Sequence, residues 1–476
     1  MAFRTFIYGE IKLKERLEKT IAAIATPIGE GAISVIRVSG EFAIDKVASR
    51  FEGKQNLAKA KSQTAHVGCI RNNHGETVDD VVCTIFRAPR SFTGENTVEV
   101  SCHGGIHVTR RVLECILETG VYPAEPGEFT QRAFLNGKLD LSQAEAIADI
   151  IQAQSDKAQQ TALDQLEGTL SKQIHAIREQ LVESLGLLEL ELDFSEEGIA
   201  LIDKKKTENL FTLGILELDQ LIKTYKYGKV WREGVRIALV GVPNAGKSSL
   251  LNALLKENRA IVTSVPGTTR DFIEETMTIS GVLFRMIDTA GLRETEDIVE
   301  KEGVQRTYKI IKGSDIVVLI HDSTKLISRD ESSFIETICK ENKSRQGFII
   351  VNNKIDLQKE SMPFTSIPEN TEVIETSAIT NVGIERLKDA LYKKVLDKTQ
   401  AEPNESVIIT NERHYSALLK AKQRLTSALH SLKAGESEEF ISIDLRAAID
   451  SIGEIVGIVT TEDILNSIFS KFCIGK

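Results

Sequence analysis

One eight-residue segment, Gly241 to Ser248, limits the folds open to this chain more than any other. It reads GVPNAGKS and fits the pattern G-x-x-x-x-G-K-[ST], with an apolar run (RIALVGV) before it and a helical pattern (KSSLLNALLK) after it. Glycines permit a tight loop whose amides point at phosphates. Lys247 can neutralise the β and γ oxygens, and the Ser248 hydroxyl suits Mg²⁺. The segment therefore predicts a nucleotide site in a strand–loop–helix context.

The chain around this segment has the pattern of an α/β domain. From Val235 to about Leu396, apolar runs alternate with helical patterns, as in a parallel sheet with helices on both faces. The predicted strands are IALVGV, FRMIDT, DIVVLIHD, GFIIVNN and EVIETSA. We expect a Ras-like α/β P-loop G domain here.

The regions on either side of this domain are helical. Residues 141–227, 412–433 and 443–472 carry apolar side chains at spacings of three and four, for example Leu141, Ala144, Ile147, Ala148 and Ile151. The simplest interpretation is one discontinuous all-α domain, built from both flanks, into which the α/β domain is inserted. Before it, residues 20–140 alternate β-rich runs (32–38, 81–86 and 97–102) with turn signals and one helix after His107, which predicts an α+β domain.

Further motifs at the predicted strand ends specify the nucleotide. In Asn353 to Asp356 (NKID), a carboxylate can accept two hydrogen bonds from N1–H and the exocyclic amine of guanine, a donor pair that adenine lacks. Ser377 and Ala378 support the base from the next strand. Asp288 to Gly291 (DTAG) closes a strand, with Asp288 near Mg²⁺ and Gly291 beside the γ-phosphate. Taken together, in this order, the motifs predict a GTPase.

The loop GTTRD at 267–271 supplies Thr269 as a second magnesium ligand beside Ser248. The predicted GTP-binding residues are Asn244, Ala245, Gly246, Lys247, Ser248, Ser249, Thr263, Ser264, Val265, Pro266, Gly267, Thr268, Thr269, Asp288, Thr289, Ala290, Gly291, Asn353, Lys354, Asp356, Ser377 and Ala378. One position is unusual: Leu292 stands where Ras-like enzymes have a Gln that orients the attacking water. Either hydrolysis is slow, or another group does this polar work.

Composition restricts the environment and the partners. The net charge of −10 gives no general attraction to nucleic acid, so a polyanion needs a local basic patch; Arg110-Arg111 and Lys204-Lys205-Lys206 are candidates, although such runs are commonly solvated surface. We see no apolar stretch of the roughly 18 residues that span a bilayer and no secretory signal.

The six cysteines form no CxxC pair, which argues against zinc and a disulfide framework and favours the cytoplasm. His103 and His107 have i,i+4 spacing but no acidic third ligand, so a zinc site there is disfavoured.

Several longer segments resemble one known family. They are ATPIGEGAISVIRVSG, SFTGENTVEVSCHGG, PGEFTQRAFLNGKLDLSQAEAIADII and the final CIGK. From Thr20 to Lys476 the chain resembles the MnmE (TrmE) family of bacterial tRNA-modifying GTPases; residues 1–19 have no counterpart in the shortest members and receive no role. The resemblance implies an N-terminal α+β folate-binding and dimerisation domain (1–139), a helical domain in two parts (140–229 and 397–476) and a G domain (230–396).

The resemblance also implies an activity with partners. Members form homodimers and hydrolyse GTP in a potassium-dependent way. With the FAD-containing protein MnmG, in a heterotetramer or larger complex, they add a carboxymethylaminomethyl or aminomethyl group to C5 of the wobble uridine of certain tRNAs. The carbon comes from 5,10-methylene-tetrahydrofolate or a formyl analogue, and FAD is bound only by the partner.

Residue roles carry over by position. The family's folate contacts fall on Arg37, Glu99, Lys138 and Lys476, and its potassium ligands fall on Asn244, Thr263, Val265 and Thr268. The glutamate that replaces the missing Gln falls on Glu300, which acts in catalysis with Lys247; by sequence alone Glu294 and Glu296 are indistinguishable from it. Cys473 is either a catalytic thiol, as a nucleophile toward C6 of uridine or a partner of the folate site, or a small buried apolar residue.

One alternative comes from another class of protein. Ribosome-assembly GTPase switches of the Era type share the phosphate loop, a TTRD-like switch and the hydrophobic residue after DxxG. They append an RNA-binding module and would not carry Arg37, Glu99 and Lys138 in an N-terminal α+β domain. A basic, KH-like C-terminus would favour them, whereas this C-terminus has a helical pattern and ends in CIGK.

Overall fold

The computed structural model describes residues 16, 18–193, 203–256, 274–288, 309–325, 332, 347–357, 371–399 and 407–476. The chain divides into two compact units. One comprises Met1–Ala148, Gln165–Glu208 and Arg424–Lys476, and the other comprises Asp149–Asp164 and Asn209–Gln423.

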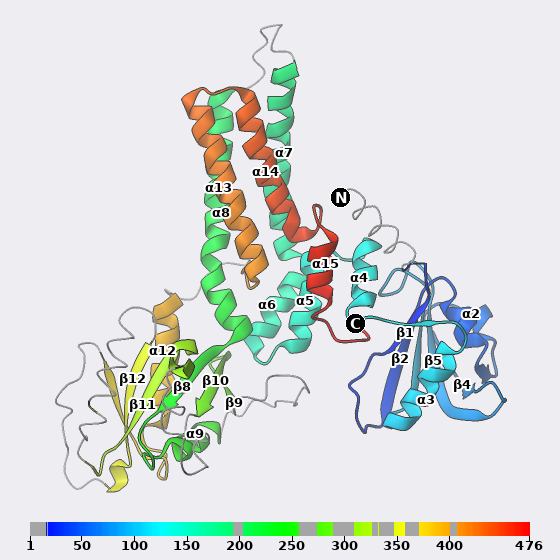
Figure 1. Cartoon of the computed structure of the whole chain (residues 1–476), viewed down its shortest axis with the longest axis horizontal. Coiled ribbons are helices and arrows are strands. Elements are labelled where there is room, and N and C mark those ends of the chain that lie inside the picture. Colours follow the sequence, from blue (N-terminus) through cyan, green and yellow to red (C-terminus); the bar gives the residue numbers. More distant parts are fainter. Residues whose placement is uncertain are drawn as a thin grey trace. The chain divides into compact units, whose positions relative to one another are not determined.

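The first unit contains a seven-stranded sheet with the order β3-β4-β5-β6-β2-β1-β7. Its strands are β1 (Ile21–Ile24), β2 (Ile33–Ser39), β3 (Phe51–Gly53), β4 (Thr64–Arg71), β5 (Thr77–Phe86), β6 (Thr97–His103) and β7 (Tyr122–Pro123). All neighbours are antiparallel except β1 and β7, which are parallel. Helices α2 (Ala43–Ala48) and α3 (Ile106–Leu117) flank this sheet (Figure 1).

Strand periodicity gives the sheet two different faces. In β2, Ile36 and Val38 are fully buried in a cluster with α2 and α3 residues. Because successive side chains alternate, Arg37 between them points to the opposite face. That face has its own small apolar cluster, which includes Ile21, Phe129 and partly buried Phe92. A charged residue predicted to bind a ligand therefore lies on the face with the smaller apolar cover.

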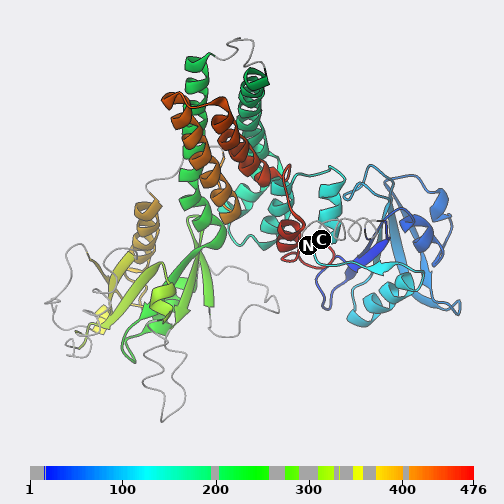
Figure 2. The same cartoon turned by 45° about the horizontal axis from the view of Figure 1, so that its top comes forward.

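Long helices make up the rest of the first unit and part of the second. They are α4 (Glu128–Leu135), α5 (Leu141–Gln152), α6 (Asp156–Leu166), α7 (Thr169–Asp193), α8 (Lys204–Glu233), α13 (Glu412–Ala434), α14 (Glu438–Val456) and α15 (Glu462–Phe469). Helices α7 and α14 lie side by side (Figures 1 and 2). Leu141 and Ala144 pack with residues of α15 in one apolar cluster.

One helical prediction was wrong in detail, and one residue of another predicted helix is more exposed than its apolar spacing suggests. The periodic pattern of 443–472 is two helices, because Gly457 has a left-handed backbone (φ 83°) that ends α14, and a Cβ there would lie 2.8 Å from the Phe134 ring. Ile151 continues the apolar spacing of α5 but is 47% exposed, so it does not belong to the core.

The second unit contains a six-stranded sheet with the order β13-β12-β11-β8-β10-β9. Its strands are β8 (Val235–Val240), β9 (Glu274–Ile279), β10 (Val282–Asp288), β11 (Ile316–Asp322), β12 (Gly347–Asn353) and β13 (Glu372–Thr376), and its main described helices are α9 (Lys247–Leu255) and α12 (Ile384–Thr399). All five predicted strands are confirmed. The sheet is not purely parallel, because β9, which we did not predict, is antiparallel to β10.

This topology gathers strand ends at one edge. Asp322 at the end of β11 is in register with Asn353 at the end of β12, which is in register with Thr376 at the end of β13. Strand β8 runs parallel to β11 and leads into the Gly241–Ser248 loop. Ligands of open parallel sheets bind beyond the carboxyl ends of the strands. The predicted nucleotide motifs are therefore brought together at that edge.

Candidate functional site

The phosphate loop joins β8 to α9, and close approaches of other groups explain its two motif glycines. A Cβ on Gly241 would lie 2.3 Å from the Ile320 carbonyl oxygen. A Cβ on Gly246, which has φ 94°, would lie 2.3 Å from Nδ2 of Asn353. No side chain fits at such distances, so glycine is required at both positions.

Lys247 begins α9 and lies across the loop. Its Nζ donates to the carbonyl oxygens of Gly241 at 2.8 Å and Val242 at 3.0 Å, and the residue is buried. Ser248 and Ser249 follow on the exposed side of the first helical turn. Backbone amides and the positive end of the helix dipole converge at this helix start, which suits an anion. The loop thus has the cation, hydroxyls and amides that a phosphate chain needs.

Asn353 links the guanine motif to the loop. Its Nδ2 donates to the Ala245 carbonyl oxygen at 3.1 Å, and its Oδ1 accepts from the Thr376 hydroxyl at 3.2 Å. The side chain is buried. With both ends of its amide engaged in protein contacts, Asn353 fixes the distance between the motifs.

The base-reading residues lie beyond Asn353. Asp356 is exposed in a short 3₁₀ helix, η4 (Ile355–Leu357). Ser377 is buried and accepts a hydrogen bond from the Thr380 amide at 3.2 Å, and Ala378 packs on the edge of the core. An exposed carboxylate beside a fixed turn is the arrangement that guanine recognition requires.

Lys354 and Asp322 complete this edge. The Lys354 ammonium donates to the Asn244 carbonyl oxygen at 2.7 Å and to Asp322 Oδ2 at 2.7 Å. Burial acts to raise the pKa of Asp322, but its bonds from Lys354 and Thr324 outweigh burial and hold that pKa below its ordinary value. Sequence reasoning missed Asp322, because it is simply the last residue of a buried apolar run.

The remaining nucleotide predictions lie outside the described residues: Thr263, Ser264, Val265, Pro266, Gly267, Thr268, Thr269, Thr289, Ala290, Gly291, Leu292 and Glu300. The backbone of Asp288 is described, and it closes β10 in register with Leu239 of β8. Three of the four predicted potassium ligands and the predicted water-orienting glutamate stay predictions without structural description.

A second group of predicted residues meets on the N-terminal sheet. Arg37 and Glu99 are cross-strand partners in β2 and β6, and Arg37 Nε and Nη2 lie 3.0 and 2.9 Å from Glu99 Oε1. The Arg37 guanidinium lies 5.4 Å from the centroid of the Phe92 ring and 5.7 Å from that of Phe129. The Arg37 side chain is 15% exposed and that of Glu99 30% exposed, so both can reach a ligand from a largely apolar surround.

The end of the chain returns to this pair. Gly475 packs closely against β1, since a Cβ there would lie 2.2 Å from the Ile24 carbonyl oxygen. The carbonyl oxygen of Gly475 accepts a hydrogen bond from Arg37 Nη1 at 3.4 Å. Burial and the neighbouring Arg37 lower the pKa of Lys476 against the opposite influence of Glu99 and Cys473. The structure therefore brings Arg37, Glu99 and Lys476 together.

Two other predicted residues behave differently. Lys138 donates to the Pro89 carbonyl oxygen at 3.2 Å and is exposed. Among the described residues, we find no hydrogen bond or ion pair that joins it to Arg37 or Glu99. Cys473 is exposed, so its interpretation as a buried apolar residue is wrong, and its thiol is accessible beside Lys476.

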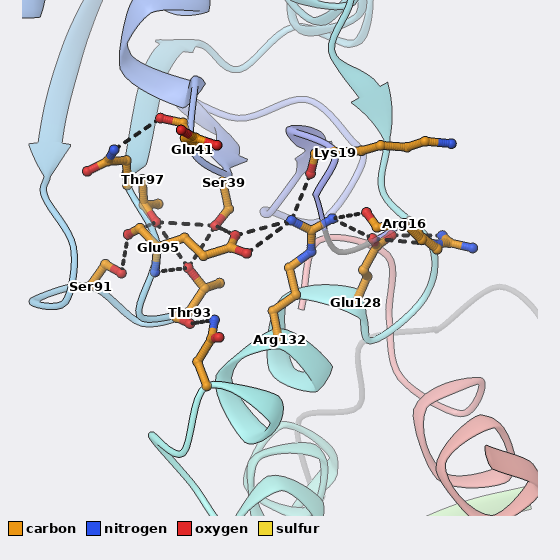
Figure 3. A network of polar contacts seen from close by, with 12 residues as sticks. Arg16, Lys19, Ser39, Glu41, Ser91, Thr93, Glu95, Thr97, Glu128 and Arg132 are labelled. Carbon is orange, nitrogen blue, oxygen red and sulfur yellow. Dashed lines mark hydrogen bonds and ion pairs between the residues drawn. The ribbon is translucent and has the colours of Figure 1, made fainter. Parts of the chain in front are cut away.

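A polar network beside this site was not predicted (Figure 3). Arg132 of α4 is fully buried and donates to Glu128 Oε1 at 2.9 Å, to both carboxylate oxygens of Glu95 at 3.2 Å and to the Lys19 carbonyl oxygen at 2.8 Å. Glu95 also accepts from Ser39 at 2.7 Å, and Glu128 accepts from Arg16 at 2.8 Å. Glu95 shares its loop with Phe92, so the network fixes the segment that covers Arg37.

One member of the histidine pair, His103, has a carboxylate partner. His103 donates its backbone amide to Asp79 and pairs with it through Nδ1 at 2.7 Å, and this carboxylate raises the pKa of His103. Within the described ranges, no three His, Cys, Asp or Glu side chains are grouped as a metal would require. The same part of the chain contains no helix both long and apolar enough to cross a membrane.

A lysine-bearing phosphate loop joined to an NKID segment at the carboxyl ends of parallel strands defines the class of P-loop GTPases. The chain also matches two family models, "MnmE helical domain" over residues 141–473 and "GTP-binding protein TrmE N-terminus" over residues 20–138. The chain belongs to the MnmE family of tRNA modification GTPases, and the resemblance predicted from sequence is confirmed.

Relatives match the chain over almost its full length. The tRNA modification GTPase MnmE of Christiangramia forsetii is 41% identical over 476 residues, 97% of this chain and 100% of that protein. The Aquifex aeolicus protein of the same name is 43% identical (97% and 100%), and that of Chlorobium luteolum is 44% identical (96% and 97%). The G domain of the T. maritima FeoB iron transporter aligns at 29% identity over 34% of this chain and 98% of that one, with a TM-score of 0.25, too low to support a conclusion.

The family and the architecture agree. An N-terminal α+β domain, helices from both flanks and an α/β P-loop G domain are all present, so the predicted fold class is confirmed. The chain is a GTP-binding enzyme of the GTPase class.

Proposed function

We propose that this chain couples potassium-dependent GTP hydrolysis to modification of tRNA. With a FAD-containing partner of the MnmG type, it adds a carboxymethylaminomethyl or aminomethyl group to C5 of the wobble uridine of certain tRNAs. The observation that carries the GTPase half is the bond from Asn353 to Ala245, which holds the guanine motif against the phosphate loop. The family of the chain supports the tRNA half.

In the G domain, the described residues of the nucleotide site have different roles. Lys247 exchanges its loop carbonyls for phosphate oxygens and neutralises charge that develops on them. Asp356 accepts from the guanine edge, and Lys354 and Ser377 hold the surrounding turn.

Two cations fit this site. Ser248 is exposed at the start of α9, so its hydroxyl would hold Mg²⁺ together with Thr269. The ion would supply neutralisation of phosphate charge. Asn244 is exposed, so its side-chain oxygen can reach a K⁺ ion that Thr263, Val265 and Thr268 would also hold. In place of a Gln, Glu300 orients the attacking water.

In the N-terminal domain, we propose that Arg37, Glu99, Lys138 and Lys476 bind a reduced folate, which supplies the one-carbon unit. The chemistry of the described residues fits this ligand. Two cations, Arg37 and Lys476, lie together and can pair with a glutamate tail, while Glu99 can accept from a pterin N–H edge. Exposed Cys473 lies beside them and is available as a nucleophile toward uridine C6.

The domain roles follow the same proposal. Residues 1–139 form the folate-binding and dimerisation domain, residues 140–229 and 397–476 form the helical domain, and residues 230–396 form the G domain. The active species is a homodimer joined by MnmG in a heterotetramer or larger complex in the cytoplasm.

Mass spectrometry of wobble uridine tests the whole proposal. We expect a strain that lacks the gene to lose the modified nucleoside, and the wild-type gene to restore it. A Lys247→Ala gene, which removes the phosphate-binding ammonium, should restore none. Unchanged uridine in the deletion strain would contradict the proposal and favour a ribosome-assembly switch of the Era type.

Binding of a reduced folate to the full-length chain tests the N-terminal half separately. Arg37→Gln removes the guanidinium that lies against Glu99 and should raise the folate Kd about tenfold or more. Arg90→Gln is the matched control, since Arg90 is exposed on the loop just before Phe92. Equal folate affinity of both variants would remove Arg37 from the folate site.

A further inference from the structure

Two residues of the nucleotide site that carry side chains have a left-handed backbone. They are Asn244 (φ 66°) in the phosphate loop and Lys354 (φ 68°) in the guanine motif. Asparagine tolerates this conformation, whereas for lysine it is uncommon and persists where neighbouring groups hold it. One hydrogen bond joins the two residues across 110 positions of sequence, from Lys354 Nζ to the Asn244 carbonyl oxygen at 2.7 Å. The geometry of both motifs thus depends on where the Lys354 ammonium is held.

Asp322 holds that ammonium. Its Oδ2 lies 2.7 Å from Lys354 Nζ, and the Asp322 side chain is only 4% exposed. Its other oxygen, Oδ1, accepts from the backbone amide of Thr324 at 3.1 Å and from the Thr324 hydroxyl at 2.7 Å. One carboxylate oxygen is therefore fixed by its own turn, which aims the other at the lysine.

The backbone around Asp322 is equally constrained. Asp322 pairs with Asn353 in the ladder between β11 and β12, and the next amide, of Ser323, donates to the Asn353 carbonyl oxygen at 2.9 Å. The carboxylate and the lysine are consequently carried by neighbouring strand ends that cannot shift independently. The Asp322 carboxylate is buried while the Lys354 side chain is 29% exposed, so solvent screens this ion pair in part.

We propose that Asp322 is a positioning residue of the guanine nucleotide site. Through its ion pair it holds Lys354, and through Lys354 it holds the Asn244 turn of the phosphate loop in the geometry that binds nucleotide. The proposal rests on the GTP site assigned under the proposed function. Asp322 acts through Lys354 and makes no contact with the ligand itself.

A purely structural role of Asp322, such as closing β11, is the competing explanation. Asp315 provides the matched control, because it immediately precedes the opposite end of β11 and its carboxylate also accepts a backbone hydrogen bond, from the Arg236 amide at 3.1 Å. A strand of this length separates the two carboxylates by about 20 Å. Asp→Asn removes the same charge at either position.

A double-mutant cycle on the full-length chain tests the proposal, with the Kd for fluorescent GDP as the readout. Asp322→Asn should raise the Kd about ten- to hundredfold, as expected for loss of a charge-assisted contact that fixes a binding group. Asp315→Asn should change it less than about twofold. Lys354→Met should raise the Kd at least as much as Asp322→Asn. The double variant should bind GDP about as weakly as Lys354→Met alone, because Asp322 acts through that lysine.

Two results would overturn the proposal: losses that multiply in the double variant, or an Asp322→Asn Kd within twofold of the wild type. If Lys354→Met itself leaves the Kd unchanged, the assigned guanine site fails as well, which separates the two failures. Hydrogen exchange of the β11 and β12 amides gives an independent reading. Lys354→Met leaves the Asp322 carboxylate buried without its ammonium and should speed this exchange, so adding Asp322→Asn should slow it again in part.

A milder variant guards against misfolding of Asp322→Asn. Thr324 is exposed, so Thr324→Val should fold normally while it removes the hydroxyl bond to Asp322 Oδ1. We expect a smaller loss of GDP affinity in the same direction, which Lys354→Met should again mask. Positioning by this carboxylate would be ruled out if Thr324→Val and a correctly folded Asp322→Asn both bound GDP with the wild-type Kd.

Discussion

Removing the buried guanidinium of Arg132 should destabilise the N-terminal sheet more than any surface substitution. Arg132 is fully buried and faces two carboxylates, Glu95 and Glu128, and two backbone carbonyls. Arg132→Met keeps an unbranched apolar chain of similar length but leaves Glu128, which is 2% exposed, with one fewer positive partner. Breaking a buried ion pair on one side costs about 3–5 kcal/mol.

This loss is large against the marginal stability of a domain, about 5–15 kcal/mol. Arg16 lies 2.8 Å from Glu128 and supplies part of the compensation, which places the expected loss at the lower end of the range. Arg132→Lys should fall between wild type and Arg132→Met, because a lysine keeps the charge but cannot bond both carboxylates and both carbonyls in the planar geometry of a guanidinium.

Hydrogen exchange of the full-length chain measures this loss locally, which matters because a multidomain chain has no single melting transition. Amides of β1, β2 and the loop that carries Glu95 should exchange about a hundred- to a thousandfold faster in Arg132→Met, since each 1.4 kcal/mol is a factor of ten. Amides of the G domain should be unchanged.

Arg111→Met is the matched control. Arg111 is an exposed arginine on α3 that lies 3.3 Å from exposed Glu114, and such surface pairs contribute about 0–1 kcal/mol. Exchange in Arg132→Met that is less than about fivefold faster than wild type, or equal to that of Arg111→Met, would refute the argument that this network stabilises the domain.

The remaining predictions concern salt, catalysis and pH. GTP hydrolysis should be about ten- to hundredfold faster in K⁺ than in Na⁺ at equal ionic strength, and equal rates would count against the Asn244 cation site. Glu300→Ala should lower kcat about a hundredfold with little change in the Kd for GTP, whereas unaltered turnover would exclude its role with water. Burial acts to raise the pKa of Glu128, but bonds from Arg16, the Glu125 amide and Arg132 lower it overall below the ordinary 4.5. The stability that Glu128 contributes is therefore present above pH 4.5 and is lost as pH falls toward the lowered pKa; Glu128→Gln should flatten this acid dependence of exchange in β1.

Fold prediction from sequence succeeded where the physics is local. Strands β8, β11 and β12 are buried on both faces, so they appear as continuous apolar runs, and the phosphate loop marks the turn after the first of them. The strands β1, β3 and β7, of four, three and two residues, are too short to show a periodicity. Strand β9 has the sequence EETMTI, and its polar residues give no apolar run from which its pairing with β10 could be predicted.

Site prediction from sequence failed for charged residues that the tertiary fold buries. Arg132 and Asp322 look like ordinary charged residues in the sequence, yet both are buried and connect segments far apart in the chain. No spacing rule reveals them, because their partners are set by strand register. Arg37 and Glu99 were assigned only through a family resemblance, and the register of β2 and β6 then placed them opposite each other.

The glycine at position 246 carries a lesson for loop grafting. A side chain there would collide with the Asn353 amide at 2.3 Å, so a residue usually ascribed to phosphate is also required by a side chain of the base motif. The base motif therefore adds its own constraint to the sequence of the phosphate loop. A loop grafted into this chain would have to keep glycine at position 246, or Asn353 would have to be replaced together with the loop.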